Sequence, residues 1–164
     1  MRSRPWIFAC TVALAACAQR GPGPGPGHAP GVEPPAASSH PSLADEQRRL
    51  ADLFKGTPVV FELQKDGSMR VSVPLRYSFD RGRHAVKPPL GAVLERVAKS
   101  QRSVPTRLLV MAPADPGAKG LLLATERASS ARDYMVARGV EATRFSIAAA
   151  GTGDVVIVVA EAAH

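Results

Sequence analysis

The sequence predicts an α/β (α+β) sandwich in which one sheet carries its helices on a single face. Three observations support this fold class. Strand-like and helix-like patterns alternate between residues 59 and 159, an Asp-Gly pair separates the first two strand-like runs, and the longest intervening segments have apolar residues at helical spacing. The expected order is an N-terminal helix, a β-hairpin and then a β-α-β-α-β-β core.

The N-terminal helix is expected within residues 42–58. Ser42 followed by Asp45 is similar to a capping box, in which side chains bind the free backbone N–H groups of a helix start. Leucines then form a partial apolar stripe, and Gly56 is a typical residue at which a helix ends. Residues 59–164 are expected to form the domain that contains the sheet.

The hairpin and the later elements follow from turn residues and periodicity. Two strand-like runs, VVFELQ and MRVSVP, enclose the turn at Asp66-Gly67. Pro88 and Pro89 suit the first turn of a helix, whereas residues 120–138 are the longest helical candidate. The segments expected as strands are residues 59–64, 69–74, 106–111, 145–149 and 155–159.

Residues 1–16 are predicted to be a lipoprotein signal peptide. Arg2 and Arg4 precede an apolar run that is too short to span a bilayer as a helix, which needs about 20 residues. The run ends in Leu-Ala-Ala-Cys, which resembles a bacterial lipobox, so Cys17 is expected to be acylated and to become the mature N-terminus. The alternative is a plain secretory signal whose cysteine lies near the cleavage site by chance.

Residues 17–41 are expected to be the lipidated cysteine followed by a Pro/Gly-rich linker. The linker contains GPGPGPG, and such a composition cannot bury a core. At about 3.1 Å per residue its reach is at most roughly 75 Å. Cys10 lies in the segment expected to be removed, so the mature chain forms no internal disulfide.

The charge of the chain restricts its partners. The formal net charge is +7, and it falls to +5 when Arg2 and Arg4 are removed with the signal peptide. Export excludes nucleic acid as a partner and leaves anionic lipid headgroups or an anionic cell-wall polymer. The basic residues are scattered, so a merely solvated surface remains an alternative.

Residues 66–150 resemble a known family. YSFDRGRHAVKPPL is similar to a strand-and-loop pattern F-D-x-G-x-x-x-[LV]-x-P, and LATERASSARDYMVARGVEATRF is similar to a helical pattern L-S-x-x-R-A-x-x-V-x-x-Y-L-x-x-x-G-V-x-x-x-R. The family is the OmpA/MotB-like peptidoglycan-binding domain, as found in peptidoglycan-associated lipoproteins. The matched residues of the second pattern are Leu123, Arg127, Ala128, Tyr134, Gly139, Val140 and Arg144.

The resemblance implies binding of the peptidoglycan stem peptide, commonly at its diaminopimelate residue, by Asp115 and Arg127. Diaminopimelate ends in an ammonium and a carboxylate, which a side-chain carboxylate and a guanidinium match. Backbone N–H groups near Gly120 would add anion binding. The alternative is that Asp115 is only a turn residue and Arg127 only a structural side chain of a helix.

The chain departs from the family pattern around the expected site. Ala112-Pro113-Ala114 stand where the family commonly has Gly-His-Thr, and the interval from Asp115 to Arg127 is about three residues shorter. These departures motivate a second hypothesis, an envelope assembly or scaffold lipoprotein that has exchanged peptidoglycan for a protein partner.

No catalytic residue, metal or cofactor is expected. His84 has no second histidine or cysteine nearby, Ser129 and Ser130 lack a suitably spaced histidine, and no G-x-S-x-G motif occurs. The expected function is therefore non-enzymatic: a lipid-anchored protein that binds peptidoglycan and tethers a membrane to the cell wall. Ala18 is compatible with sorting to the outer membrane, with the domain facing the periplasm.

Overall fold

A computed structural model describes residues 40–115, 120–150 and 153–162, which belong to one compact unit. The expected signal peptide, Cys17 and the linker as far as residue 39 lie outside the described residues. None of the described helices is long and apolar enough to cross a bilayer.

The described strands form one mixed sheet in the order β1-β2-β5-β3-β4. Strand β3 pairs in parallel with β4, whereas the other neighbouring strands pair antiparallel. The last strand of the chain, β5, therefore lies between β2 and β3 in the interior of the sheet. The strands are β1 (Val60–Leu63), β2 (Met69–Pro74), β3 (Thr106–Pro113), β4 (Phe145–Ala150) and β5 (Asp154–Glu161).

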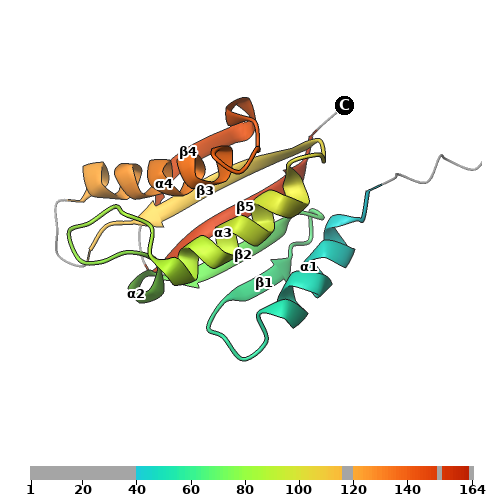
Figure 1. Cartoon of the computed structure of the whole chain (residues 1–164), viewed down its shortest axis with the longest axis horizontal. Coiled ribbons are helices and arrows are strands. Elements are labelled where there is room, and N and C mark those ends of the chain that lie inside the picture. Colours follow the sequence, from blue (N-terminus) through green and yellow to red (C-terminus); the bar gives the residue numbers. More distant parts are fainter. Residues whose placement is uncertain (1–39, 116–119, 151–152, 163–164) are drawn as a thin grey trace, which may run out of the picture. The chain divides into compact units, whose positions relative to one another are not determined.

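The three longer helices lie over one face of the sheet (Figure 1), which confirms the predicted fold class. The second strand of the hairpin, β2, is the first strand of the expected β-α-β-α-β-β core. The described helices are α1 (Leu43–Leu53), α2 (Leu75–Ser78), α3 (Pro88–Gln101), α4 (Leu121–Val136) and the 3-10 helix η1 (Ala142–Arg144).

Local interactions explain several element boundaries. Ser42 caps α1, because its Oγ accepts a hydrogen bond of 3.2 Å from the backbone N–H of Asp45. Gly67 has a φ of +81° in the hairpin turn, a conformation that glycine adopts without a steric cost. The short helix α2 was not predicted; it follows Pro74 directly, and the Ser78 hydroxyl donates to the Pro74 carbonyl at 3.1 Å.

The core lies between the sheet and these helices. Alternate residues of β2 and β5 point into it, and they pack against the apolar faces of α3 and α4. Fully or almost fully buried members include Val71, Val73, Leu90, Leu94, Val97, Leu108, Val110, Ala128, Ala131, Met135, Val155, Ile157 and Val159. This packing fixes where β3 ends relative to α4, and that relation sets the geometry of the site.

Candidate functional site

Arg127 of α4 is the largest side chain that the core encloses completely, with 0% of its surface exposed. A buried guanidinium is costly unless its charge is paired and its N–H groups find acceptors. Arg127 meets both conditions at the carboxyl end of β3. Its Cζ atom also lies 5.4 Å from the ring centroid of Phe79, in a cation–π arrangement.

The guanidinium of Arg127 donates four hydrogen bonds, two to the loop after α2 and two to the carboxyl end of β3 and the residues that follow it. Nε bonds to the carbonyl of Arg83 at 2.9 Å, and Nη1 bonds to the carbonyl of Pro113 at 2.9 Å. Nη2 bonds to the carbonyl of Asp80 at 3.0 Å and to Oδ1 of Asp115 at 2.7 Å. Arg127 therefore joins α4, the end of β3 and the loop after α2.

Asp115 follows β3 by two residues and is held from two sides. Its Oδ1 accepts from Arg127, and its Oδ2 accepts from the backbone N–H of Gly82 at 2.5 Å. Both bonds stabilise the ionised carboxylate, so the Gly82 N–H first and then the Arg127 guanidinium hold the pKa of Asp115 below its usual value. The Asp115 side chain is 11% exposed.

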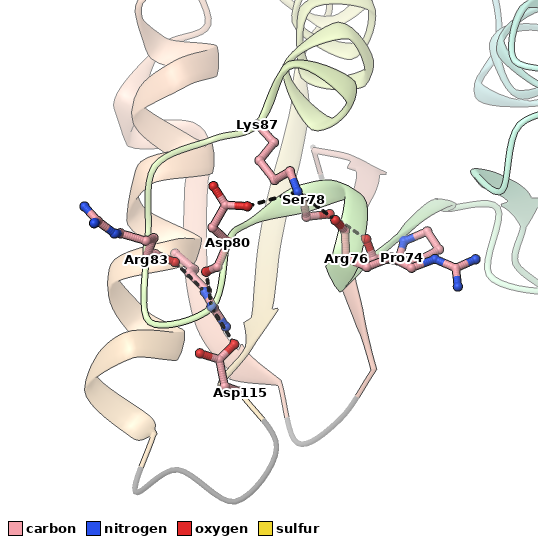
Figure 2. Close-up of polar contacts among 8 residues, drawn as sticks. Pro74, Arg76, Ser78, Asp80, Arg83, Lys87 and Asp115 are labelled. Atoms are coloured by element: carbon pink, nitrogen blue, oxygen red, sulfur yellow. Dashed lines mark hydrogen bonds and ion pairs between the residues drawn. The ribbon is translucent and has the colours of Figure 1, made fainter.

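The backbone of the loop from Asp80 to Lys87 contacts both residues of this pair, and Figure 2 shows Asp115 beside the loop. Gly82 has a φ of +66°, and this left-handed turn directs its N–H to Asp115. Lys87 closes the other end of the loop: its Nζ lies 3.1 Å from Oδ1 of Asp80 and donates to the carbonyl of Arg76 at 3.0 Å. We call residues 80–87 the site loop.

The structure thus brings together the two residues that the family resemblance assigned to the site. Sequence reasoning missed the backbone contributions of Asp80, Gly82 and Arg83, because a carbonyl or N–H carries no signature in the side chains. The available signal was the F-D-x-G pattern, in which the glycine supplies the left-handed turn.

The other residues considered from the sequence lie in the site loop, on α4 or directly before α4. His84 and Glu126 form a long, exposed ion pair of 3.7 Å, which forms only when the histidine is protonated. Ser129 and Ser130 are partly buried on α4, and Gly120 precedes the first turn of that helix. Within the described ranges, no three potential metal ligands of the His, Cys, Asp or Glu type gather at one place.

Apolar side chains are exposed at the same end of the domain. Leu121 and Leu122, in the first turn of α4, are 74% and 72% exposed. Beside Leu121 is a shallow depression of about 280 Å³, lined otherwise by Ala114, Gly120, Ala124, Ala149 and Ala150.

Comparisons with known proteins confirm the fold. The chain is 23% identical to the cell wall anchor of the type VI secretion system (T6SS) from Pseudomonas aeruginosa, with a TM-score of 0.59 over 76% of this chain and 99% of that one. It is 18% identical to a periplasmic domain of MotB from Helicobacter pylori, with a TM-score of 0.55 over 76% and 87% of the two chains.

A third solved structure, described as a MotB-like protein from Desulfovibrio vulgaris, is 13% identical, with a TM-score of 0.61 over 73% of this chain and 92% of that chain. No protein-family model matches the sequence, and no curated protein matches it. The chain therefore shares the fold of a cell wall anchor and of MotB periplasmic domains, which is the fold that the sequence resemblance implied.

Proposed function

We propose that this chain is a lipid-anchored envelope protein that binds peptidoglycan non-covalently and tethers the outer membrane to the cell wall. The binding site is the surface built on Asp115 and Arg127. The observation that carries the proposal is the ion pair between these residues beneath the site loop, in a fold shared with a cell wall anchor.

The two ends of the chain have complementary roles in this proposal. Cys17 holds the lipid, and the linker after it lets the domain reach the wall from the membrane. The function is one of attachment, and none of its steps requires a reaction to be catalysed.

The binding site is tested by retention on purified sacculi, with the full-length chain in detergent. The double variant Asp115→Asn/Arg127→Lys loses the ionic pair but retains similar side-chain sizes. We expect its retention to fall at least about tenfold, because one lost charge-assisted contact is worth about 1.5–3 kcal/mol. The matched control is Asp133→Asn/Arg132→Lys, a pair with the same 2.7 Å Nη2···Oδ1 distance on the exposed side of α4.

The results separate the function from the site. Absence of wild-type retention would remove the proposed function, and equal retention of wild type and the Asp115/Arg127 variant would remove the site. Because Arg127→Lys can loosen the domain, Asp115→Asn is also tested alone, and circular dichroism establishes that each variant is folded.

The lipid anchor has its own test. Palmitate labelling in cells should mark the wild-type chain and not Cys17→Ala, and the variant should leave the membrane fraction. Equal labelling of both chains would contradict acylation at Cys17. Separation of the inner and outer membranes then establishes which of them holds the labelled protein.

A second candidate function is an envelope scaffold lipoprotein that binds a protein partner. The exposed Leu121 and Leu122 favour it because, with the alanine-lined depression beside them, they form apolar surface of the kind that contacts other proteins. Cross-linking in cells that captures wall fragments and no defined protein would count against this alternative.

A further inference from the structure

A cavity of about 250 Å³ lies at the end of the domain opposite to the Asp115–Arg127 pair. Pro41, just before α1, and Thr106, the first residue of β3, both line it. Asp115 lies beyond the other end of β3, so the eight residues of this strand separate the two places by roughly 25 Å. Figure 1 shows the start of α1 and the end of α3 at one end of the domain and the site loop at the other. The proposed wall-binding site therefore makes no use of this cavity.

The charged lining of the cavity consists of one neutralised pair and three further groups. Both carboxylate oxygens of Glu46 accept hydrogen bonds from Arg49, at 2.8 and 2.6 Å, so these two charges compensate each other. The further groups are Arg96, Lys99 and Glu161. None of the ion pairs among the described residues includes any of the three. Two cations and one carboxylate therefore remain available to a ligand.

The backbone places these three groups around the same space. Arg96 and Lys99 are three residues apart in the second half of α3, so their side chains share one face of the helix. Glu161 is the register partner of Thr106, and both side chains therefore lie on the same face of the sheet. That face is the one that the helices cover, because the Thr106 hydroxyl donates to Gln101 of α3 at 3.0 Å.

This arrangement matches a phosphate that carries an ammonium group on a short arm. A guanidinium and a lysine ammonium are the side-chain groups that most often bind phosphate, and a carboxylate accepts hydrogen bonds from an ammonium. A phosphate alone would leave Glu161 facing another negative charge, whereas phosphoethanolamine places its ammonium there. The cavity is smaller than the range of about 300–1,000 Å³ typical of sites for drug-sized ligands, so a small headgroup suits it.

The path of the chain indicates where such a group comes from. Pro41 lines the cavity, so the segment that leads to Cys17 joins the domain beside it. In the proposed function Cys17 is held in a membrane, which keeps phospholipid headgroups within reach of the linker. The tether gives these headgroups a higher effective concentration at the cavity than a phosphoester free in solution has.

We propose that this cavity binds the phosphoethanolamine headgroup of a membrane phospholipid, with Arg96 and Lys99 on the phosphate and Glu161 on the ammonium. The proposal goes beyond the proposed function and rests on it only for the presence of a membrane near the cavity. Because Asp115 lies at the opposite end of the domain, a domain held in this way presents its Asp115 end away from the membrane.

The test is sedimentation with vesicles, using residues 17–164 with Cys17→Ala, so that neither acylation nor the apolar run before Cys17 contributes to binding. This chain contains the whole compact unit of residues 38–164. One set of vesicles is phosphatidylcholine alone, and the other is an equal mixture of phosphatidylcholine and phosphatidylethanolamine. Neither lipid has a net charge, so attraction to an anionic surface does not contribute.

The variants are Arg96→Gln/Lys99→Gln and, separately, Glu161→Gln. The matched control is Arg102→Gln/Arg107→Gln, which removes two exposed cations that lie near the same end of the domain and do not line the cavity. Circular dichroism establishes that each variant is folded.

We expect the unchanged chain to bind the mixed vesicles at least about tenfold more tightly than phosphatidylcholine alone, because the methylated ammonium of choline donates no hydrogen bond to Glu161. The Arg96/Lys99 variant should bind the mixed vesicles at least about tenfold more weakly. Glu161→Gln should bind the two kinds of vesicle equally, and the control should bind as the unchanged chain does.

Three results would overturn the proposal. One is equal binding of the unchanged chain to both kinds of vesicle. Another is a control that binds as weakly as the Arg96/Lys99 variant, which would assign the effect to general positive charge. The third is calorimetric binding of glycerophosphoethanolamine in solution without binding to vesicles, which would assign the cavity to a soluble phosphoester.

Retention on sacculi separates this proposal from the proposed function. The Arg96/Lys99 variant should be retained as well as the unchanged chain, because the cavity and Asp115 lie at opposite ends of β3. Loss of sacculus retention by this variant would contradict a separate role for the cavity. Absence of retention of the unchanged chain would contradict wall binding, while the vesicle measurements would still decide on the headgroup site.

Discussion

Two arginines from the C-terminal half of the chain hold the two ends of β3, and they do so with different companions. Arg127 bonds to the carboxyl end, where Asp115 supplies a negative charge. Arg144 bonds to the amino end through Thr106 and the carbonyl of Gln101, at distances of 2.5–2.8 Å, without an acidic partner among those contacts.

The difference follows from burial. Arg144 is partly exposed to solvent, and the nearby charge of Glu141 acts on it without a direct ion pair among the described contacts. Arg127 is fully enclosed and requires a counter-ion. The position of Asp115 is therefore already explained by its structural role as the counter-ion of a buried arginine. A binding function of Asp115 must be tested separately from its effect on stability.

The largest expected effect comes from removing the buried guanidinium of Arg127. We expect Arg127→Leu to lower the free energy of unfolding by about 3–5 kcal/mol, because it removes the counter-ion of Asp115 and leaves three carbonyls without their donor. Arg144→Leu should cost about 1–3 kcal/mol, since water reaches its acceptors more easily. Urea unfolding measures both values.

Equal costs for the two arginines would break the comparison, because they would mean that the counter-ion adds nothing. Arg127→Lys keeps the charge and loses the fork of donors. If Arg127→Lys lowers the free energy of unfolding nearly as much as Arg127→Leu, the hydrogen-bond geometry of the guanidinium is what stabilises the fold. If the loss is small, the positive charge alone is sufficient.

A smaller effect is expected from the carboxylate itself. The folded-state pKa of Asp115 is lowered, so its stabilising contribution is present above the ordinary pKa and is lost as the pH falls through the lowered value. Asp115→Asn should cost about 1–2 kcal/mol at pH 7, and its difference from wild type should shrink below about pH 4.

This pH dependence is measured by urea unfolding between pH 7 and pH 2.5. Asp133→Asn is the control, because the one ion pair that Asp133 makes with the described residues is with the neighbouring Arg132 on the surface of α4. A difference between wild type and Asp115→Asn that stays constant with pH would contradict the lowered pKa.

The smallest effect concerns the outer side of the site loop. Glu126→Gln removes the exposed 3.7 Å contact with His84 and should change the free energy of unfolding by less than about 0.5 kcal/mol. A larger loss would show that this surface pair holds the loop together with Arg127.

The sequence predicted the elements better than it predicted their arrangement. Apolar periodicity located α3, α4 and the strands, and Ser42 marked the start of α1. Periodicity contains no information on which strands are neighbours, so the place of β5 between β2 and β3 could not be derived from it. The helix α2 is too short to establish a period.

The candidate site was also predicted only in part from the sequence. The family pattern placed Asp115 and Arg127 together, and the structure shows them in contact. The carbonyls that accept hydrogen bonds from Arg127 are backbone groups, so the residue types at those positions do not predict the contacts.

The interior position of β5 has a consequence for biosynthesis. Strands β2 and β3 have no partner between them until residues 154–161 have been made, so the sheet cannot close before those residues are available. An exported lipoprotein, which we propose this chain to be, benefits from that delay if it crosses the membrane unfolded. Its topology postpones folding until the last strand emerges, which favours completion of the domain after translocation.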